Sequence, residues 1–233
     1  FQTFSIQDQG VVYALVDKYL IFASSFEAAK AAIEALQLAP ITSLSPKTLA
    51  LLQDSDLFKP PKTLSLQQAI GQVLMIGFEG TTLTPELQDL MKRLSPGGVL
   101  LLSKNIQSVE QLRLLTQDLQ RISFEYSSLP LFIAVDQEGG AISRIDFGRE
   151  KTPQSTIEDV DHAYQVGQER AEELKFLGVN LNLSPVLDST DSNDFLFDRT
   201  FQAGRLEAGT LAEALLAGQK SAGIFSTLKH FPG

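Results

Sequence analysis

The sequence lacks several residue types and patterns, and each absence narrows the classes of protein to which it can belong. It has no cysteine, so it forms neither disulfides nor thiolate metal sites; this fits oxidising and reducing compartments alike and leaves the localisation open. No apolar run reaches the roughly 18 residues of a membrane helix, so we predict no membrane span. Lysine and arginine number only 19 against 28 acidic residues and form no basic run, which argues against a nucleic-acid partner.

Two N-terminal segments of different character precede the main part of the chain. Residues 1–38 contain apolar runs at 11–16 and 19–23, separated by the two residues of a tight β-hairpin, and then an alanine-rich stretch that predicts a helix at 26–38. This small α+β hairpin and helix cannot build a core of its own, so we interpret it as the tail of a preceding domain. Residues 39–63 hold four prolines among serines and threonines and are typical of a linker.

From residue 64 to residue 233, the hydrophobic pattern alternates between strands and helices. We expect strands at 72–78, 98–102, 131–135, 179–183 and 224–228, and helices at 66–70, 85–94, 109–123, 157–177 and 206–222. This alternation predicts an α/β domain with a parallel sheet. No glycine-rich nucleotide-binding loop follows the first strand, and a complete eight-stranded barrel needs about 250 residues. We therefore predict a partial TIM (β/α)8-type barrel with about five βα units.

Charged side chains and glycines follow two of the predicted strands. The third strand leads into Asp136, Glu138, a glycine pair and Arg144, and the fifth leads into Lys229, His230 and a Pro-Gly turn. In parallel sheets and barrels, ligands bind beyond the carboxyl ends of the strands. A single aspartate at such a place is more often a cap of a turn or helix, but two such strand ends favour a binding site. Because the chain stops directly after the second turn, we expect that it is cut within a domain.

Seven short motifs follow one another between residue 76 and residue 233. They are residues 76–78 (IGF), 97–101 (GGVLL), 136–140 (DQEGG), 177–182 (LGVNLN), 184–188 (SPVLD), 199–201 (RTF) and 229–233 (KHFPG). Each is weak alone, but their order and spacing resemble the N-terminal barrel of glycoside hydrolase family 3. The DQEGG and KHFPG forms resemble its β-N-acetylhexosaminidase branch rather than its β-glucosidase branch. The resemblance runs from about residue 66 to residue 233.

The resemblance implies roles for the residues that match these motifs. Asp136 is expected to accept hydrogen bonds from hydroxyls of the terminal sugar of the substrate. The same sugar pocket is expected to be lined by Arg144, Arg199, Lys229 and His230. Carboxylates and fixed cationic donors pair well with hydroxyls, so the residue types suit a sugar. For Arg199 the alternative is a surface ion pair, and its place in the chain favours the pocket.

Four further polar residues receive structural or open interpretations. Glu138 is expected to be structural rather than a catalytic acid, and Asp188 is expected to organise loops. His162, in the acidic start of a predicted helix, is expected to be a solvated histidine. Asn105 is either a polar group on the sugar side or a helix cap, and the sequence does not separate these two possibilities.

The implied reaction is retaining hydrolysis of a terminal β-linked N-acetylglucosamine, in cell-wall fragments or chitin-type oligosaccharides. It proceeds through a covalent glycosyl-enzyme and needs no metal or organic cofactor. The family's acid/base histidine–aspartate pair and its aspartate nucleophile are expected after Gly233. No catalytic residue is therefore assigned within the chain, and the chain alone is expected to be inactive.

Two positions depart from the pattern of the family, and two other functions stay open. Ala141 stands where arginine is common, which removes a cation near the pocket, and Gln202 stands where glycine is usual. One alternative is a family 3 exo-glycosidase of another specificity, such as a β-glucosidase. The other is a non-catalytic barrel that binds sugar or serves as an interaction module. The oligomeric state is left open.

Overall fold

The chain divides into two compact units, Phe1–Leu64 and Ser65–Gly233. The computed structural model describes residues 12–16, 19–23 and 64–230. In the first unit, β1 (Val12–Val16) and β2 (Tyr19–Ala23) form an antiparallel hairpin with Val16 opposite Tyr19, the register that a two-residue turn predicts. The predicted helix at 26–38 and the predicted linker at 39–63 lie outside the described residues.

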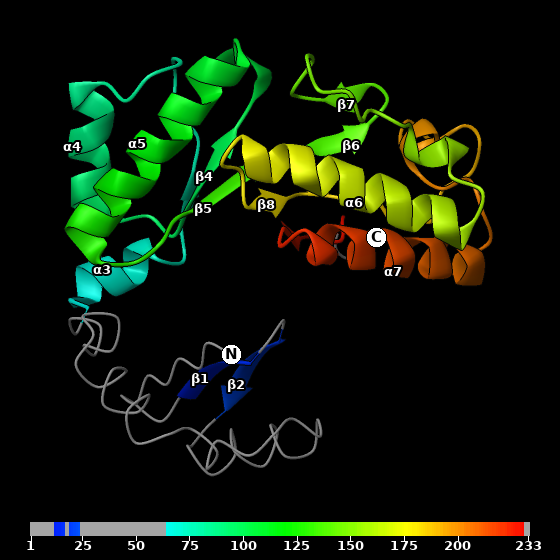
Figure 1. Cartoon of the computed structure of the whole chain (residues 1–233), viewed down its shortest axis with the longest axis horizontal. Coiled ribbons are helices and arrows are strands. Elements are labelled where there is room, and N and C mark those ends of the chain that lie inside the picture. Colours follow the sequence, from blue (N-terminus) through cyan, green and yellow to red (C-terminus); the bar gives the residue numbers. More distant parts are fainter. Residues whose placement is uncertain (1–11, 17–18, 24–63, 231–233) are drawn as a thin grey trace. The chain divides into compact units, whose positions relative to one another are not determined.

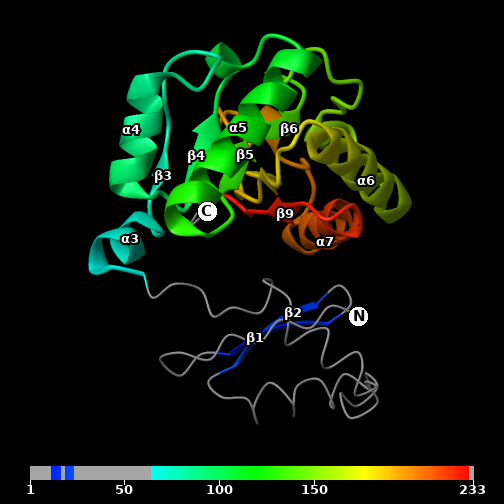
Figure 2. The same cartoon turned by 60° about the vertical axis from the view of Figure 1, so that its left-hand side comes forward.

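The second unit is built on a parallel sheet of five strands whose spatial order follows the chain, β3-β4-β5-β8-β9. The strands are β3 (Met75–Ile76), β4 (Gly98–Leu101), β5 (Phe132–Val135), β8 (Leu181–Asn182) and β9 (Phe225–Ser226). They alternate with α3 (Leu66–Gly71), α4 (Pro85–Leu94), α5 (Val109–Ser127), α6 (Val160–Phe176) and α7 (Arg205–Ser221), as Figures 1 and 2 show. This confirms the α/β class with a parallel sheet and is consistent with part of a (β/α)8 barrel.

The core of this unit lies between the sheet and the helices. Alternate strand residues are fully buried against α4 and α5: Val99, Leu101, Ile133 and Val135. The residues between them point to the opposite face of the sheet, because side chains alternate along a strand. On that face Met75, Phe132 and Phe225 are 42%, 43% and 53% exposed, and the two phenylalanine rings meet edge to face at 5.5 Å. The sheet therefore has one closely packed face and one face with exposed apolar side chains.

Helices α6 and α7 pack side by side and support a second, smaller core (Figure 1). Their backbones approach closely at Gly167, where a Cβ atom would lie 2.2 Å from the carbonyl oxygen of Leu215, so only glycine fits there. Phe201 is buried in this core, and Leu187 packs against it. The core thereby anchors two loops, which carry Asp188 and Arg199.

The structure corrects the length of several predicted elements. The strand predicted at 72–78 is reduced to Met75–Ile76, because the N–H groups of Val73 and Leu74 bond back to the carbonyls of Ile70 and Gly71. The last two strands contain two residues each instead of five. Helix α5 extends to Ser127, and α6 begins only at Val160, after the 3-10 turn Gln154–Thr156.

The sequence analysis did not predict the β-hairpin that follows β5. The residues after β5, interpreted as a turn, form a short antiparallel hairpin of β6 (Gln137–Gly139) and β7 (Ile142–Ser143). Ala141, at the position where the resemblance leads us to expect arginine, lies exposed in its turn. The 3-10 turn Ser103–Asn105 follows β4, and the 3-10 turn Phe197–Arg199 precedes α7. Within the described part of the chain, no helix has the length and apolar character needed to cross a membrane.

Candidate functional site

Asn182, at the end of β8, fixes the loop that follows β5. Its side-chain oxygen accepts the N–H of Gln137 at 3.0 Å, and its amide nitrogen donates to the carbonyl of Gln137, also at 3.0 Å. The side chain of Gln137 in turn accepts the N–H of Ile145 at 3.1 Å. All three residues are buried. Since Asp136 and Arg144 are the direct neighbours of these anchored residues, their backbones are held in place.

A buried arginine supports the same loop from behind. Arg170 of α6 is 1% exposed and donates to the carbonyl of Glu138 at 2.8 Å, to the carbonyl of Thr152 at 3.0 Å and to the carboxylate of Glu150 at 2.6 Å. Between them Gly139 has φ +93°, and a Cβ atom there would lie 2.0 Å from the oxygen of Thr152. This close approach explains why the first strand of the hairpin, β6, ends with a glycine.

The sequence analysis missed Arg170, although the pattern contains a signal for it. The residue lies four positions from both Val166 and Leu174, so it falls on the apolar face of its helix. A cation on such a face is buried only where carbonyls and a carboxylate satisfy it. An arginine in an apolar helical stripe is therefore a sign of a loop held by side-chain donors.

The strand ends at 184–188 and 229–230 are joined to each other. Val186 pairs with Lys229 in a parallel bridge, and the N–H of Leu187 donates to the carbonyl of Lys229 at 2.7 Å. The side chain of Gln154 accepts the N–H of Val186 at 3.0 Å and donates to its carbonyl at 2.6 Å. The Ser184–Pro185 and Lys229–His230 peptide bonds are cis. These contacts place Asp188 directly beside His230.

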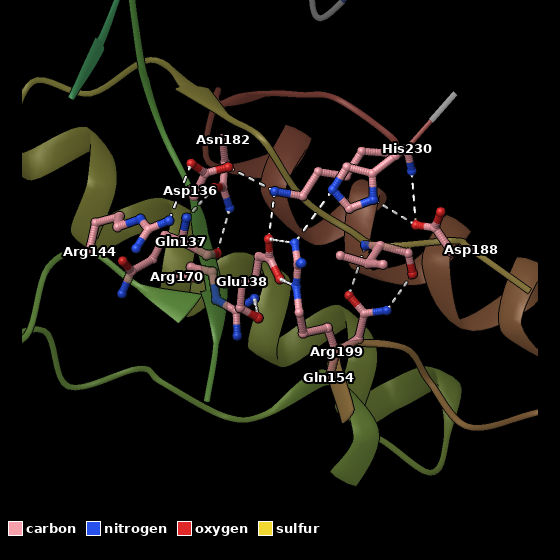
Figure 3. A network of polar contacts seen from close by, with 12 residues as sticks. Asp136, Gln137, Glu138, Arg144, Gln154, Arg170, Asn182, Asp188, Arg199 and His230 are labelled. Carbon is pink, nitrogen blue, oxygen red and sulfur yellow. Dashed lines mark hydrogen bonds and ion pairs between the residues drawn. The ribbon is translucent and has the colours of Figure 1, made fainter. Parts of the chain in front are cut away.

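Beyond the strand ends, charged side chains form a chain of alternating sign (Figure 3). Arg144 lies 3.9 Å from Asp136, whose other oxygen accepts Lys229 Nζ at 2.8 Å. Lys229 Nζ also contacts Glu138 Oε1 at 2.5 Å. Glu138 accepts two bonds from Arg199, at 2.9 Å from Nε and 2.8 Å from Nη2. These hydrogen bonds raise the pKa of Arg199 above its ordinary value, against the opposing effect of burial.

His230 and Asp188 complete the chain. Nε2 of His230 lies 3.4 Å from Nη2 of Arg199, and Asp188 Oδ2 lies 2.8 Å from Nδ1 of His230 and accepts its backbone N–H at 2.9 Å. Burial alone would raise the pKa of Asp188, but the hydrogen bonds from His230 lower it below its ordinary value. We refer to the seven residues of this chain as the strand-end cluster: Asp136, Glu138, Arg144, Asp188, Arg199, Lys229 and His230.

The structure brings all five predicted pocket residues into the strand-end cluster, together with Glu138 and Asp188. Arg199 makes an ion pair, as the alternative interpretation held, but with a buried partner inside the cluster. Asn105 lies outside it: its oxygen accepts the N–H of Leu102 at 3.0 Å in the short 3-10 turn, and its nitrogen donates to two loop carbonyls. His162 also lies apart, with its backbone N–H capped by Asp159 at the start of α6.

Cavities on the surface only partly coincide with this cluster. Asp188 lines a cavity of about 430 Å³ with Thr190, Phe201 and other residues of the loop before α7. A cavity of about 500 Å³, lined by Arg149, Glu169 and Glu172 among others, contains no residue of the cluster. Among the described residues, no group of three or more histidines and carboxylates is placed to hold a metal ion.

Comparison with known proteins identifies the family. Residues 65–233 match the model of the glycosyl hydrolase family 3 N terminal domain. The chain belongs to glycoside hydrolase family 3. It is 36% identical over 168 residues to a β-hexosaminidase of Idiomarina loihiensis, covering 69% of this chain and 50% of that protein. It is 34% identical over 200 residues to β-hexosaminidase A of Pseudoalteromonas piscicida, covering 73% and 33%. The chain thus spans a third to a half of the length of these relatives.

Solved structures share the fold of this family 3 chain. A family 3 β-N-acetylglucosaminidase from Paenibacillus sp. superposes with a TM-score of 0.69 at 30% identity, over 73% of this chain and 34% of that one. NagZ from Neisseria gonorrhoeae, in complex with N-trifluoroacetyl-D-glucosamine, gives 0.61 at 32% identity, over 69% and 50%. The family inferred from the motifs is confirmed, and so is the resemblance to its β-hexosaminidase members.

Gln202, at the position where the resemblance leads us to expect glycine, has a positive φ of 52°. A positive φ destabilises the folded state by roughly 1–2 kcal/mol when the residue carries a side chain, and glycine avoids most of this cost. Glycine also makes the unfolded chain more flexible, which offsets about 0.5–1 kcal/mol of the gain. We expect Gln202→Gly to raise the free energy of unfolding by up to about 1 kcal/mol. Thermal denaturation of both variants measures the change. Since the side chain is exposed, a clear loss of stability would show that its contacts near Phe197 outweigh the backbone strain.

Proposed function

We propose that the strand-end cluster binds the terminal sugar of a β-linked N-acetylglucosaminide, and that a family 3 enzyme containing this chain hydrolyses it with retention of configuration. The observation that carries this proposal is the convergence of the five predicted pocket residues at one edge of the sheet. A relative at 32% identity binds an N-acylated glucosamine analogue, which supports the choice of sugar. Cell-wall fragments and chitin-type oligosaccharides contain such terminal units.

The contacts within the cluster suit a sugar as ligand. Asp136 is 18% exposed and offers a carboxylate at the carboxyl end of β5, and Lys229 beside it offers an ammonium group. Arg144 makes only a long contact to Asp136, and its Nε is buried without a hydrogen-bond partner among the described residues. A buried donor without a partner is costly, so a hydroxyl that accepts from Arg144 would relieve that cost.

The carboxylates of the cluster fit binding better than catalysis. A retaining glycosidase needs a general acid with a raised pKa and a nucleophilic carboxylate close to it. The pKa of Asp188 is lowered, and Glu138 is enclosed by Arg199 and Lys229. We therefore propose that the acid/base group and the nucleophile come from outside residues 1–233, and that this chain supplies the groups that orient the sugar.

The test combines binding and turnover measurements on the purified chain. Saturation-transfer NMR should show contact with N-acetylglucosamine and weaker contact with glucose. No release of chromophore is expected from β-N-acetylglucosaminide or β-glucoside substrates. Asp118→Asn, at an exposed ion pair on α5, serves as the control variant and should bind sugar as the wild type does.

Three outcomes would change the proposal. Equal contact with both sugars would favour a glucosidase of the same family, and contact with neither would remove the sugar pocket. Turnover by a homogeneous preparation of this chain would show that residues of the cluster perform the chemistry. Asp188 and Glu138 would then be the first carboxylates to examine as the catalytic pair.

A further inference from the structure

Both ring nitrogens of His230 face groups whose hydrogen-bonding role is known. Nδ1 lies 2.8 Å from Asp188 Oδ2, and Nε2 lies 3.4 Å from Nη2 of Arg199 (Figure 3). A carboxylate that is ionised only accepts hydrogen bonds, and a guanidinium only donates them. The two neighbours therefore determine where the proton of the imidazole resides.

The carboxylate side fixes the proton on Nδ1. Oδ2 of Asp188 accepts the backbone N–H of His230 at 2.9 Å as well as the ring nitrogen, so ring and backbone are held by one oxygen. Asp188 is 11% exposed, and the hydrogen bonds from His230 hold its pKa below the ordinary value despite burial, which keeps it ionised. An ionised Asp188 leaves Nδ1 no role other than donor.

The guanidinium side leaves Nε2 without a proton. Nη2 of Arg199 is held at 2.8 Å from Glu138, and Glu138 is 3% exposed with Lys229 on its other side, so Arg199 is not free to turn away. If Nε2 carried a proton, its N–H would face an N–H of Arg199, and two hydrogen-bond donors would oppose each other. A ring protonated at both nitrogens would add a positive charge beside Arg199 and Lys229.

We propose that Asp188 is a positioning residue that holds His230 as the neutral Nδ1–H tautomer, so that Nε2 acts as a hydrogen-bond acceptor in the sugar pocket. This inference rests on the proposed function for its ligand. His230 is 44% exposed, so an incoming hydroxyl can reach the ring; by donating to the single lone pair of Nε2 it takes the place of the long 3.4 Å contact from Arg199. The pocket then offers acceptors at Asp136 and His230 and donors at Lys229 and Arg144. A sugar hydroxyl both donates and accepts, and this arrangement serves both functions.

Nitrogen NMR of the imidazole rings tests the tautomer without any substrate. The chain contains only two histidines, so a His162→Gln variant assigns every ring signal. At about pH 8, well above the ordinary pKa of histidine, His230 should show a protonated Nδ1 and an unprotonated Nε2. His162 lies outside the cluster and serves as the internal reference. A proton on Nε2 of His230, on both nitrogens, or exchanging between them as in a solvated ring would overturn the inference.

The variant Asp188→Asn separates positioning from mere structural support. An amide offers both donors and an acceptor, so the ring of His230 should lose its single tautomer, while Asp118→Asn should leave the ring signals unchanged. Binding of N-acetylglucosamine should weaken by roughly tenfold or more in Asp188→Asn, because a hydrogen bond to a charged group is lost behind the ring. Unchanged affinity in a folded Asp188→Asn protein would refute the positioning role.

The two proposals fail in different ways. If the wild-type protein shows the Nδ1–H tautomer but does not bind N-acetylglucosamine, the sugar pocket is wrong and the Asp188–His230 geometry stands. If the protein binds the sugar but the ring carries its proton on Nε2, the proposed function stands and this inference is wrong. Should Asp188→Asn fail to fold, the wild-type spectrum alone decides on the tautomer.

Discussion

Replacing Asp136 with asparagine should lower kcat/KM for a chromogenic β-N-acetylglucosaminide by roughly a hundredfold or more in the longest protein that carries this chain. Asparagine keeps the size of the side chain but removes the charge that accepts hydrogen bonds from sugar hydroxyls. It also brings an amide donor into the place of an oxygen that lies 2.8 Å from Lys229. Contacts to hydroxyls strengthen in the transition state, so we expect the loss in kcat as well as in KM. Steady-state kinetics of both proteins measures it.

Asp146→Asn is the matched control for this prediction. Asp146 lies on the same loop, ten residues further along the chain, and is exposed to solvent. The same chemical change there should leave kcat/KM near the wild-type value, since an exposed carboxylate outside the cluster loses little. Thermal unfolding of both variants shows whether Asp136→Asn is folded. A folded variant with nearly normal kcat/KM would contradict the role of Asp136 in sugar binding.

The location of the site could be predicted from the sequence because the topology is regular. Asp136 and Lys229 are 93 residues apart, yet Asp136 directly follows β5 and Lys229 lies three residues past the end of β9, in one parallel sheet. The carboxyl ends of such strands meet at one edge, so a charged residue after each of them predicts contact. The sugar-binding roles of these residues came from the resemblance to a family, because spacing alone does not distinguish a sugar from another polar ligand.

The pairing inside the site could not be predicted, because it depends on side-chain directions that the hydrophobic pattern does not encode. The sequence treats Glu138 as one polar residue of a turn. In the structure it lies on a strand of an unpredicted hairpin, and its carboxylate points between Arg199 and Lys229. The bounds of the short strands could not be predicted either, because a two-residue strand such as β9 is too short to show a hydrophobic period.

Glu138→Gln should destabilise the second unit more than any surface substitution of the same kind. The carboxylate is 3% exposed, and Arg199 and Lys229, 24% and 12% exposed, depend on it as a shared counter-ion. Breaking a buried ion pair by removing one partner costs about 3–5 kcal/mol, because the remaining charge stays buried and uncompensated. For a domain of this size that corresponds to a fall in Tm of roughly 6–20 °C. Calorimetry or thermal circular dichroism measures the change.

Glu79→Gln is the matched control for Glu138→Gln. Glu79 also forms an ion pair, with Lys104, but its side chain is 83% exposed, so its loss should cost less than about 1 kcal/mol. If both variants change Tm by the same small amount, the cations around Glu138 are hydrated, and Glu138 does not hold them. If only Glu138→Gln is destabilised, one buried carboxylate keeps Arg199 and Lys229 side by side against their mutual repulsion. The cationic side of the proposed sugar pocket then depends on a residue that need not touch the sugar.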